Sequence, residues 1–207
     1  MIVPKTFYQR ADVVQIAKDL LGKYLVTHFD GKITSGIIVE TEAYSGFCDK
    51  ASHAYGERFT KRTEVMYRQG GTAYIYLCYG VHSLFNIVTN KAGIPDAVLI
   101  RGILPAEGLN VMLLRTGKQK TTGKIGLGPG KASKLLGIHF SATGSPVTFL
   151  EENQPKPLIW VEDRGNLVTE SEIMASPRIG VDYAGEDAKL PWRFQLKKKC
   201  PSEKEHF

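Results

Sequence analysis

The stretch KYLVTHFDGKITSGIIVETEAY, residues 23–44, has the pattern of a complete β-hairpin. Two runs rich in β-branched and aromatic residues, 23–29 and 32–40, flank the dipeptide Asp30-Gly31. Asp and Gly both tolerate the positive φ angles that a tight two-residue turn requires. The stretch therefore predicts two antiparallel strands joined by this turn.

The end of this stretch places two carboxylates on one face of the second strand. Side chains alternate along an extended chain, so Glu40, Glu42 and Tyr44 should point the same way. Two acids beside an aromatic ring are typical of an active site. Acids at a strand end are also commonly solvated or ion-paired, so the local pattern leaves both interpretations open.

The neighbouring sequence predicts a helix before this hairpin and a second hairpin after it. Apolar residues recur at helical spacing across residues 13–21, and Gly22 stands where a left-handed cap would end the helix. The β-rich runs 72–77 and 83–89 are separated by a short turn that puts Tyr79 at the tip.

Hairpins and interspersed helices, without a regular strand and helix alternation, predict an α+β fold with a mainly antiparallel sheet and surrounding helices. We expect a single domain over residues 1–207, since 207 residues are enough for one well-buried core. The remaining predicted elements are strands at 97–100, 146–150, 158–162 and 192–196, helices at 106–115 and 131–136, and a long polar loop at 45–69.

Composition excludes several classes of protein. The hydrophobic content of 43% matches a folded soluble domain. No apolar stretch approaches the ~20 residues of a membrane span, and the first residues lack a signal-peptide core. We expect a protein that is cytoplasmic, or nuclear in a eukaryote, and neither secreted nor bound to a membrane. Cys48, Cys78 and Cys200 lack the paired spacing of a zinc site, which predicts reduced thiols, no metal and no other cofactor.

The charge balance favours a polyanionic partner. The net charge is +6 and the isoelectric point is about 9.1, and clustered Lys and Arg gain affinity for phosphates by releasing counterions. Many basic proteins bind no nucleic acid, so charge alone does not decide. Residues 197–207, which begin with three lysines, are expected to form a flexible basic tail.

A Gly-rich loop at residues 126–131 invites a nucleotide-binding interpretation. The Walker pattern fails because Ile125 replaces its first Gly and Ala132 its Ser or Thr, and the Rossmann spacing fails at Lys131. A helix N-terminus with exposed amides and a Lys remains, which can hold a backbone phosphate of a nucleic acid or can simply connect two elements.

Aromatic residues of the second hairpin are mostly expected in the core. Tyr79 is the exception, because an aromatic side chain beside Gly80 at a hairpin tip is hard to bury within its own domain. It is a candidate wedge between stacked bases. His53 lies in the polar loop, where a His is more often a surface residue than a ligand, and no second His stands at metal spacing.

Motifs spread in order along nearly the whole chain closely resemble the alkyladenine DNA glycosylase family, also called 3-methyladenine DNA glycosylases. The resemblance implies an enzyme that flips a damaged purine out of double-stranded DNA and hydrolyses its N-glycosidic bond, initiating base-excision repair. The matching motifs are VETEAY (39–44), ASH (51–53), GTAYIYLCYG (71–80), Asn86, VLIR (98–101), GPGK (128–131), RIGV (178–181), AG (184–185) and WRF (192–194).

The resemblance implies roles for individual residues. Glu42 matches the base that activates water and stabilises the oxocarbenium-like sugar. Arg101 matches the arginine that helps to hold the water, and the main-chain carbonyl of Ile179 matches a further water contact. The implied base pocket consists of the aromatic walls Tyr44, His53 and Tyr76 and of Asn86, which crowds the amino group of normal guanine; the implied DNA contacts are Tyr79 as the wedge, Thr60, Arg62 and Lys131.

Selectivity would follow partly from charge. Alkylation at a ring nitrogen makes a purine cationic, and a cation over an aromatic face gains about 0.5–2 kcal/mol. The chain departs from the family pattern at Lys61 and Thr63, in place of Pro and Asn, at Leu104, in place of an acid, and at Cys78, in place of a bulky aliphatic residue. These departures affect loop geometry and substrate range rather than reaction class.

Two other functions compete with this interpretation. One is a non-catalytic module that binds damaged DNA, with Glu42 only structural. The other is a bifunctional glycosylase with lyase activity, which needs an amine nucleophile. No Lys occupies a pocket position in the matched motifs, so we expect a monofunctional enzyme, acting as a monomer on damaged duplex DNA. The sequence does not rank alkylated against deaminated purines, and His53 is a weak candidate for a general acid.

Overall fold

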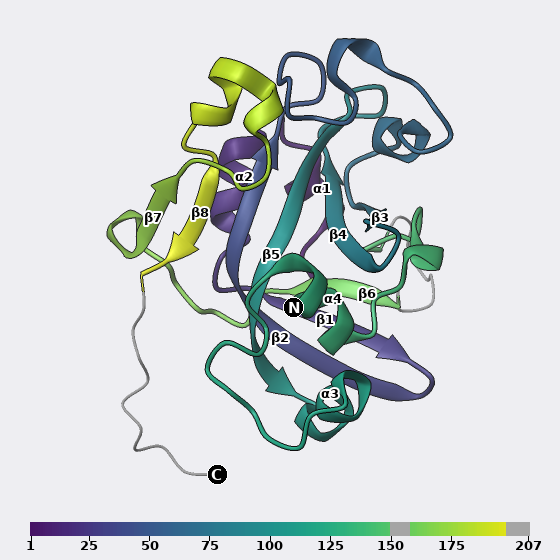
Figure 1. Ribbon diagram of the computed structural model, residues 1–207, viewed down its shortest axis with the longest axis vertical. Coiled ribbons are helices and arrows are strands. Elements are labelled where there is room, and N and C mark those ends of the chain that lie inside the picture. Colours follow the sequence, from purple (N-terminus) through teal and green to yellow (C-terminus); the bar gives the residue numbers. More distant parts are fainter. Residues whose placement is uncertain (150–157, 198–207) are drawn as a thin grey trace.

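The computed structural model describes residues 1–149 and 158–197, and its centre is one antiparallel β-sheet (Figure 1). Within the described residues the sheet has eight strands, paired in the order β3-β4-β5-β2-β1-β6, while β8 pairs with both β2 and β7. This arrangement confirms the predicted α+β class. The strands are β1 (Tyr24–Phe29), β2 (Lys32–Tyr44), β3 (Thr72–Cys78), β4 (His82–Thr89), β5 (Asp96–Glu107), β6 (Ile159–Glu162), β7 (Ile173–Ser176) and β8 (Arg193–Leu196).

The hairpin of β1 and β2 forms as the sequence predicts. Asp30 and Gly31 adopt φ angles of 53° and 70°, and Phe29 pairs with Lys32 across the turn. Strand β2 continues to Tyr44, four residues beyond its predicted end, because its second half pairs with β5 on one side and β8 on the other. This extension places Glu42, like Glu40 before it, in the middle of the sheet.

The second hairpin is also confirmed. Strands β3 and β4 pair from Thr72↔Val88 to Cys78↔His82. Tyr79 lies in the turn between them with a φ angle of 51° and 94% of its surface exposed. A bulky residue in this left-handed conformation is unusual and marks the turn as a place to look for function.

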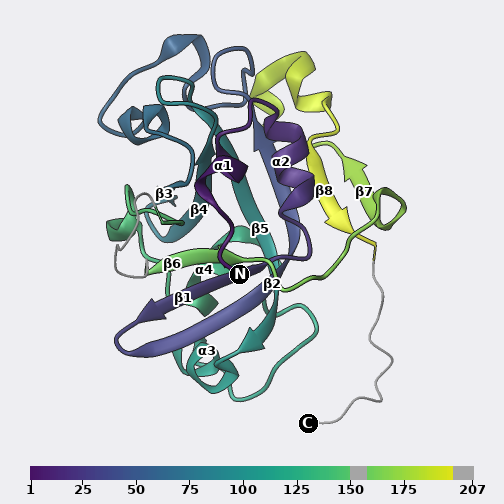
Figure 2. The same cartoon turned by 180° about the vertical axis from the view of Figure 1, so that it is seen from behind.

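Helices lie on both faces of the sheet (Figures 1 and 2). Helix α2 begins as predicted, with Asp12 as its N-cap, and ends slightly early at Asp19. It lies against β2, where the Thr41 hydroxyl donates to the Ala17 carbonyl. The helices are α1 (Lys5–Tyr8), α2 (Val13–Asp19), α3 (Leu109–Thr116) and α4 (Pro129–Leu136), with short 3-10 helices η1 (Tyr55–Glu57), η2 (Glu64–Tyr67), η3 (Phe140–Ala142), η4 (Glu170–Glu172) and η5 (Asp182–Lys189).

Three further elements differ from the prediction. The helix predicted at 106–115 begins only at Leu109, because β5 continues through Glu107 in register with β2. Over the described part of 146–150 only a single bridge forms, at Pro146, which has no N–H to donate to a ladder. Strand β7 was not predicted, since its four residues include none that is buried.

Other predicted elements are confirmed: β6 and β8 lie within 158–162 and 192–196, and the loop at 45–69 contains only η1 and η2. Lys197, the first residue of the predicted tail, is held by hydrogen bonds to Ser171 and Glu172, and the rest of that tail lies outside the described residues. No helix in residues 1–149 and 158–197 is long and apolar enough to cross a membrane.

Candidate active site

A cavity of about 470 Å³ lies where the end of β2, the β3–β4 hairpin, the 45–69 loop and the segment before η5 converge. The residues that line it come from distant parts of the sequence, and they include most of the predicted site. The predicted residues on its wall are Tyr44, His53, Arg62, Tyr76, Tyr79, Asn86, Arg101 and Ile179.

Glu42 lies directly behind this wall, with none of its surface exposed. One carboxylate oxygen accepts hydrogen bonds from the Tyr44 hydroxyl at 2.8 Å and from Arg101 at 3.2 Å. The other accepts the backbone N–H of Ile179 at 2.9 Å. All three donor residues line the cavity, so Glu42 is held at its back by the residues that face a ligand.

The environment of Glu42 makes it a stronger base than a free carboxylate. Burial raises the pKa of Glu42, and Arg101, the Ile179 amide and the Tyr44 hydroxyl each oppose part of that rise. These donors interact best with the ionised form. Burial and fixed donors together give a carboxylate with increased basicity and a single defined orientation.

Glu40, the other candidate acid, is an ion-pair partner. Its carboxylate contacts Arg101 at 3.2 Å and Arg193 at 3.1 Å. Strands β2 and β5 shift register on both sides of Glu40, a bulge that redirects neighbouring side chains. Arg101 therefore bridges Glu40 and Glu42, and of the two acids only Glu42 also contacts Tyr44 and Ile179.

The surroundings of His53 favour its neutral form. Its Nε2 lies 3.3 Å from the Arg62 guanidinium, which can only donate, so Nδ1 carries the proton and donates to the Tyr74 hydroxyl at 2.7 Å. Burial, followed by Arg62 and Arg58, lowers the pKa of His53 to about 4. Its ring meets that of Tyr76 edge-on with centroids 4.7 Å apart. Such a neutral ring serves as a wall, which counts against His53 as a general acid at neutral pH.

Asn86 is held by main-chain carbonyls. Its Nδ2 donates to Tyr74 at 3.1 Å and to Leu84 at 3.3 Å, and the side chain is buried. Because both N–H groups point toward these carbonyls, the amide orientation is defined, and Oδ1 is the atom turned the other way. Asn86 is therefore held in one orientation at the cavity wall.

The predicted DNA contacts are only partly gathered at the cavity. Arg62 and Tyr79 line it, whereas Thr60 and Lys131 do not. The Thr60 hydroxyl bonds with that of Thr63 and so orders its own loop. Lys131 is exposed in the first turn of α4. The N–H of Gly128 donates to the Arg101 carbonyl, which anchors the Gly-rich loop beside the site.

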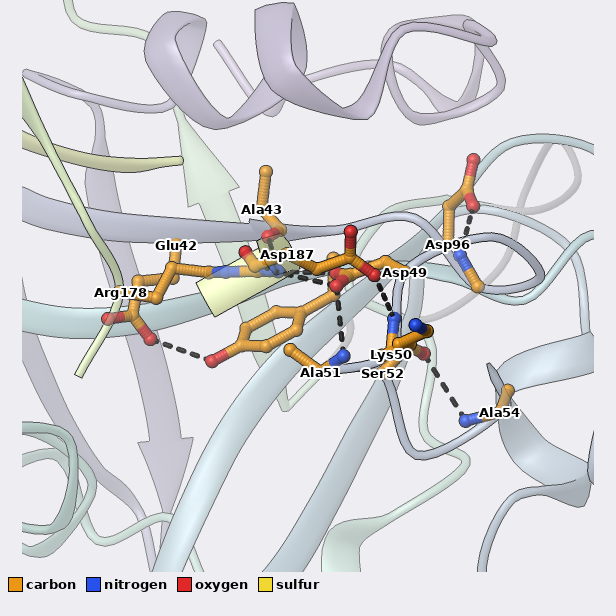
Figure 3. A network of polar contacts seen from close by, with 12 residues as sticks. Glu42, Ala43, Asp49, Lys50, Ala51, Ser52, Ala54, Asp96, Arg178 and Asp187 are labelled. Carbon is orange, nitrogen blue, oxygen red and sulfur yellow. Dashed lines mark hydrogen bonds and ion pairs between the residues drawn. The ribbon is translucent and has the colours of Figure 1, made fainter. Parts of the chain in front are cut away.

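Sequence reasoning missed a buried ion pair behind the cavity, between Asp49 and Arg178 (Figure 3). Arg178 also donates to the carbonyls of Ala43 at 2.9 Å and Asp187 at 3.0 Å. Tyr183 lines the cavity and was also not predicted; its hydroxyl donates to the carbonyl of Ala51, another lining residue. Arg178 falls in a matched motif, but nothing in the sequence pairs it with an acid 129 positions away.

Known proteins resemble this chain over nearly its whole length. A family model described as Methylpurine-DNA glycosylase (MPG) matches residues 6–200. A Chlamydia abortus protein is 46% identical over 196 residues, which cover 94% of this chain and 98% of that protein. A Bacillus cytotoxicus protein is 42% identical over 199 residues, which cover 94% of this chain and 95% of that protein. Both carry the provisional name 3-methyladenine DNA glycosylase. The chain belongs to the methylpurine-DNA glycosylase family.

Proposed function

We propose that this protein is a monofunctional DNA glycosylase that flips damaged purines out of duplex DNA and hydrolyses their N-glycosidic bonds. One observation carries the proposal: a buried carboxylate, Glu42, is oriented by three donors at the back of a cavity of about 470 Å³. That volume lies within the usual range of small-molecule sites. Family membership supports this reaction class, and the geometry supports Glu42 as the residue that performs the reaction.

In the proposed reaction Glu42 acts as an ionised base. As the bond between the sugar and the base breaks, its electron pair leaves with the base and positive charge develops on the sugar. Glu42 stabilises that charge and takes a proton from the attacking water, whose oxygen bonds to the sugar carbon. A carboxylate has about four acceptor positions, and three are taken by Tyr44, Arg101 and Ile179. The fourth is the position that we propose for the water.

Arg101 and Ile179 are proposed to position the water beside Glu42. Both residues line the cavity and both donate to the Glu42 carboxylate. The resemblance assigned the Ile179 carbonyl to a water contact, while the structural contact of Ile179 with Glu42 is made by its N–H. The two roles are compatible, since the N–H and the carbonyl of one residue can serve different partners.

The cavity walls are proposed to hold the flipped base. Tyr44, His53 and Tyr76 provide aromatic faces and edges, and a flipped nucleotide is commonly bound by stacking against such groups. The rigidly held side chain of Asn86 is proposed to exclude normal guanine by steric crowding of its amino group. Tyr79, almost fully exposed at the hairpin tip, would fill the space that the flipped nucleotide leaves in the stack.

A basic surface next to the cavity supports binding of the DNA backbone. A second cavity of about 330 Å³ shares Arg62 and Tyr76 with the first and is also lined by Lys61 and Arg68. Exposed cations on one surface suit a phosphate backbone. Lys61 replaces the family's Pro, so this departure adds a charge where we propose that the strand passes. Thr60 and Lys131 are proposed as further backbone contacts.

The test of the proposal is single-turnover release of free base from duplexes that carry 7-methylguanine, hypoxanthine or ethenoadenine. We expect release from at least one of these duplexes, an intact abasic strand as the other product, and no release from undamaged DNA. Strand nicking together with a covalent adduct trapped by borohydride would contradict the monofunctional mechanism. Binding without release from any lesion would identify a damage-recognition module instead. We also expect a monomer, which sedimentation of the DNA-free protein would check.

A further inference from the structure

Arg178 is a buried cation on the far side of one wall of the candidate active site. Its guanidinium carbon lies 4.7 Å from the centre of the Tyr44 ring and 5.2 Å from that of Trp192. Its side chain has 0% of its surface exposed, and it does not line the cavity, whereas Tyr44 does. The guanidinium therefore covers the side of the Tyr44 ring that faces away from the cavity.

Protein groups hold this cation firmly in place. Both terminal nitrogens of Arg178 donate to the Asp49 carboxylate (Figure 3). In addition, Nη1 donates to the carbonyl of Ala43 and Nη2 to that of Asp187. A buried ion pair costs desolvation and is often no more stable than an apolar pair of similar volume. The Arg178 Nε is buried without a partner, a further cost. Stability alone thus gives little reason for a charge here.

The charge acts on the ring that it covers. Burial and the neighbouring Glu42 raise the pKa of the Tyr44 hydroxyl, while Arg178 lowers it, so the positive end of the ion pair is felt at Tyr44. A cation is attracted to an aromatic face by the negative potential of the ring. When one face of the ring already carries a guanidinium, a cation on the other face meets a weaker negative potential of the ring. It is also repelled by the like charge of the guanidinium across the ring.

We propose that Arg178 is a specificity-determining positioning residue, whose charge acts through Tyr44 to reduce the preference of the cavity for cationic over neutral purines. The inference rests on the proposed function. Tyr44 then binds flipped bases by stacking and contact area more than by attraction of charge. A chain with Arg178 accepts neutral damaged purines in competition with cationic alkylated ones.

Competition binding in a Glu42→Gln background tests this, because base contacts are then measured without the chemical step. Duplexes carrying 7-methylguanine, a cationic base, or hypoxanthine, a neutral one, compete for the protein. The variant Asp49→Asn/Arg178→Met removes the charge without leaving Asp49 ionised and unpaired. We expect its binding ratio of cationic to neutral lesion to rise by about five-fold. Arg178→Lys keeps the cation and should leave the ratio within about two-fold.

A change in ratio below about two-fold in the charge-removing variant would overturn the inference, because a purely structural role lowers both affinities together. The inference would also be overturned if Arg178→Lys shifts the binding ratio as much as the charge-removing variant does. Thermal unfolding of each variant verifies that it is folded. Release assays with the protein carrying Glu42 run alongside. Release of neither base there, and none of ethenoadenine, would refute the proposed function itself, whereas release of both bases with unchanged binding ratios refutes only the role of Arg178.

Discussion

Tyr44→Phe isolates one hydrogen bond to the candidate base. The substitution keeps the aromatic wall and removes the hydroxyl that donates to Glu42 at 2.8 Å. A hydrogen bond to a charged group contributes about 1.5–3 kcal/mol. The donor stabilises the ionised form of Glu42, so its loss raises the pKa of that carboxyl. At ~1.4 kcal/mol per pH unit, the increase should be about one to two units.

The assay is the pH dependence of single-turnover base release at saturating enzyme. Glu42 acts only when ionised, so release rises with pH through the pKa of Glu42, which burial already places above its usual value. In Tyr44→Phe the acid limb of the profile should move to higher pH by about one to two units. Tyr76→Phe is the matched control, because it makes the same chemical change in another wall residue with no hydrogen bond to Glu42. An acid limb that stays in place in Tyr44→Phe, or moves equally in Tyr76→Phe, would refute the reasoning.

Two further predictions concern stability and DNA binding. The pKa of His53 falls from 6.5 to about 4 on folding, so protons bind the unfolded state better and stability decreases as pH falls through that interval. Urea unfolding at pH 7.5 and 4.5 should show that His53→Gln reduces this loss by about 2–3 kcal/mol, and equal losses in both proteins would contradict it. Lys61→Ala/Arg68→Ala should make the negative slope of log affinity against log salt less steep by about 2. The control Lys5→Ala/Lys32→Ala changes two lysines outside both cavities and should leave the slope unchanged. Identical slopes in the two variants would argue against the second cavity as a strand contact.

Local signals predicted the parts of the fold that depend on neighbouring residues. Asp30-Gly31 fixes its hairpin because two adjacent residues can adopt positive φ angles. The alternation of side chains along β2 likewise placed Glu40, Glu42 and Tyr44 on one face, where the structure links all three to Arg101 or to one another. Period and turn chemistry act over a few residues, and the sequence displays them directly.

Contacts between distant segments were beyond such signals. Strand β7 exists because β8 pairs with it, not because its own residues favour burial. The bond from the Ile179 N–H to Glu42 spans 137 positions and involves the backbone, which leaves no trace in residue type. The ion pair of Asp49 and Arg178 likewise joins residues 129 positions apart, which come together only when the chain folds. Resemblance supplied the identities of the pocket residues and singled out Glu42 as the base, and the structure added that Glu40 is an ion-pair partner of Arg101 and Arg193.

That distinction is the most direct test of the account. Glu42→Gln and Glu40→Gln make the same change in two acids that both contact Arg101, and single-turnover base release is measured beside binding of the same damaged duplex. Glu42→Gln should bind normally but lose about a hundred-fold or more of the release rate, the usual contribution of a general base, while Glu40→Gln loses less than about ten-fold. Release that survives in Glu42→Gln, or that falls equally in both variants, would contradict the assignment of Glu42 as the catalytic base.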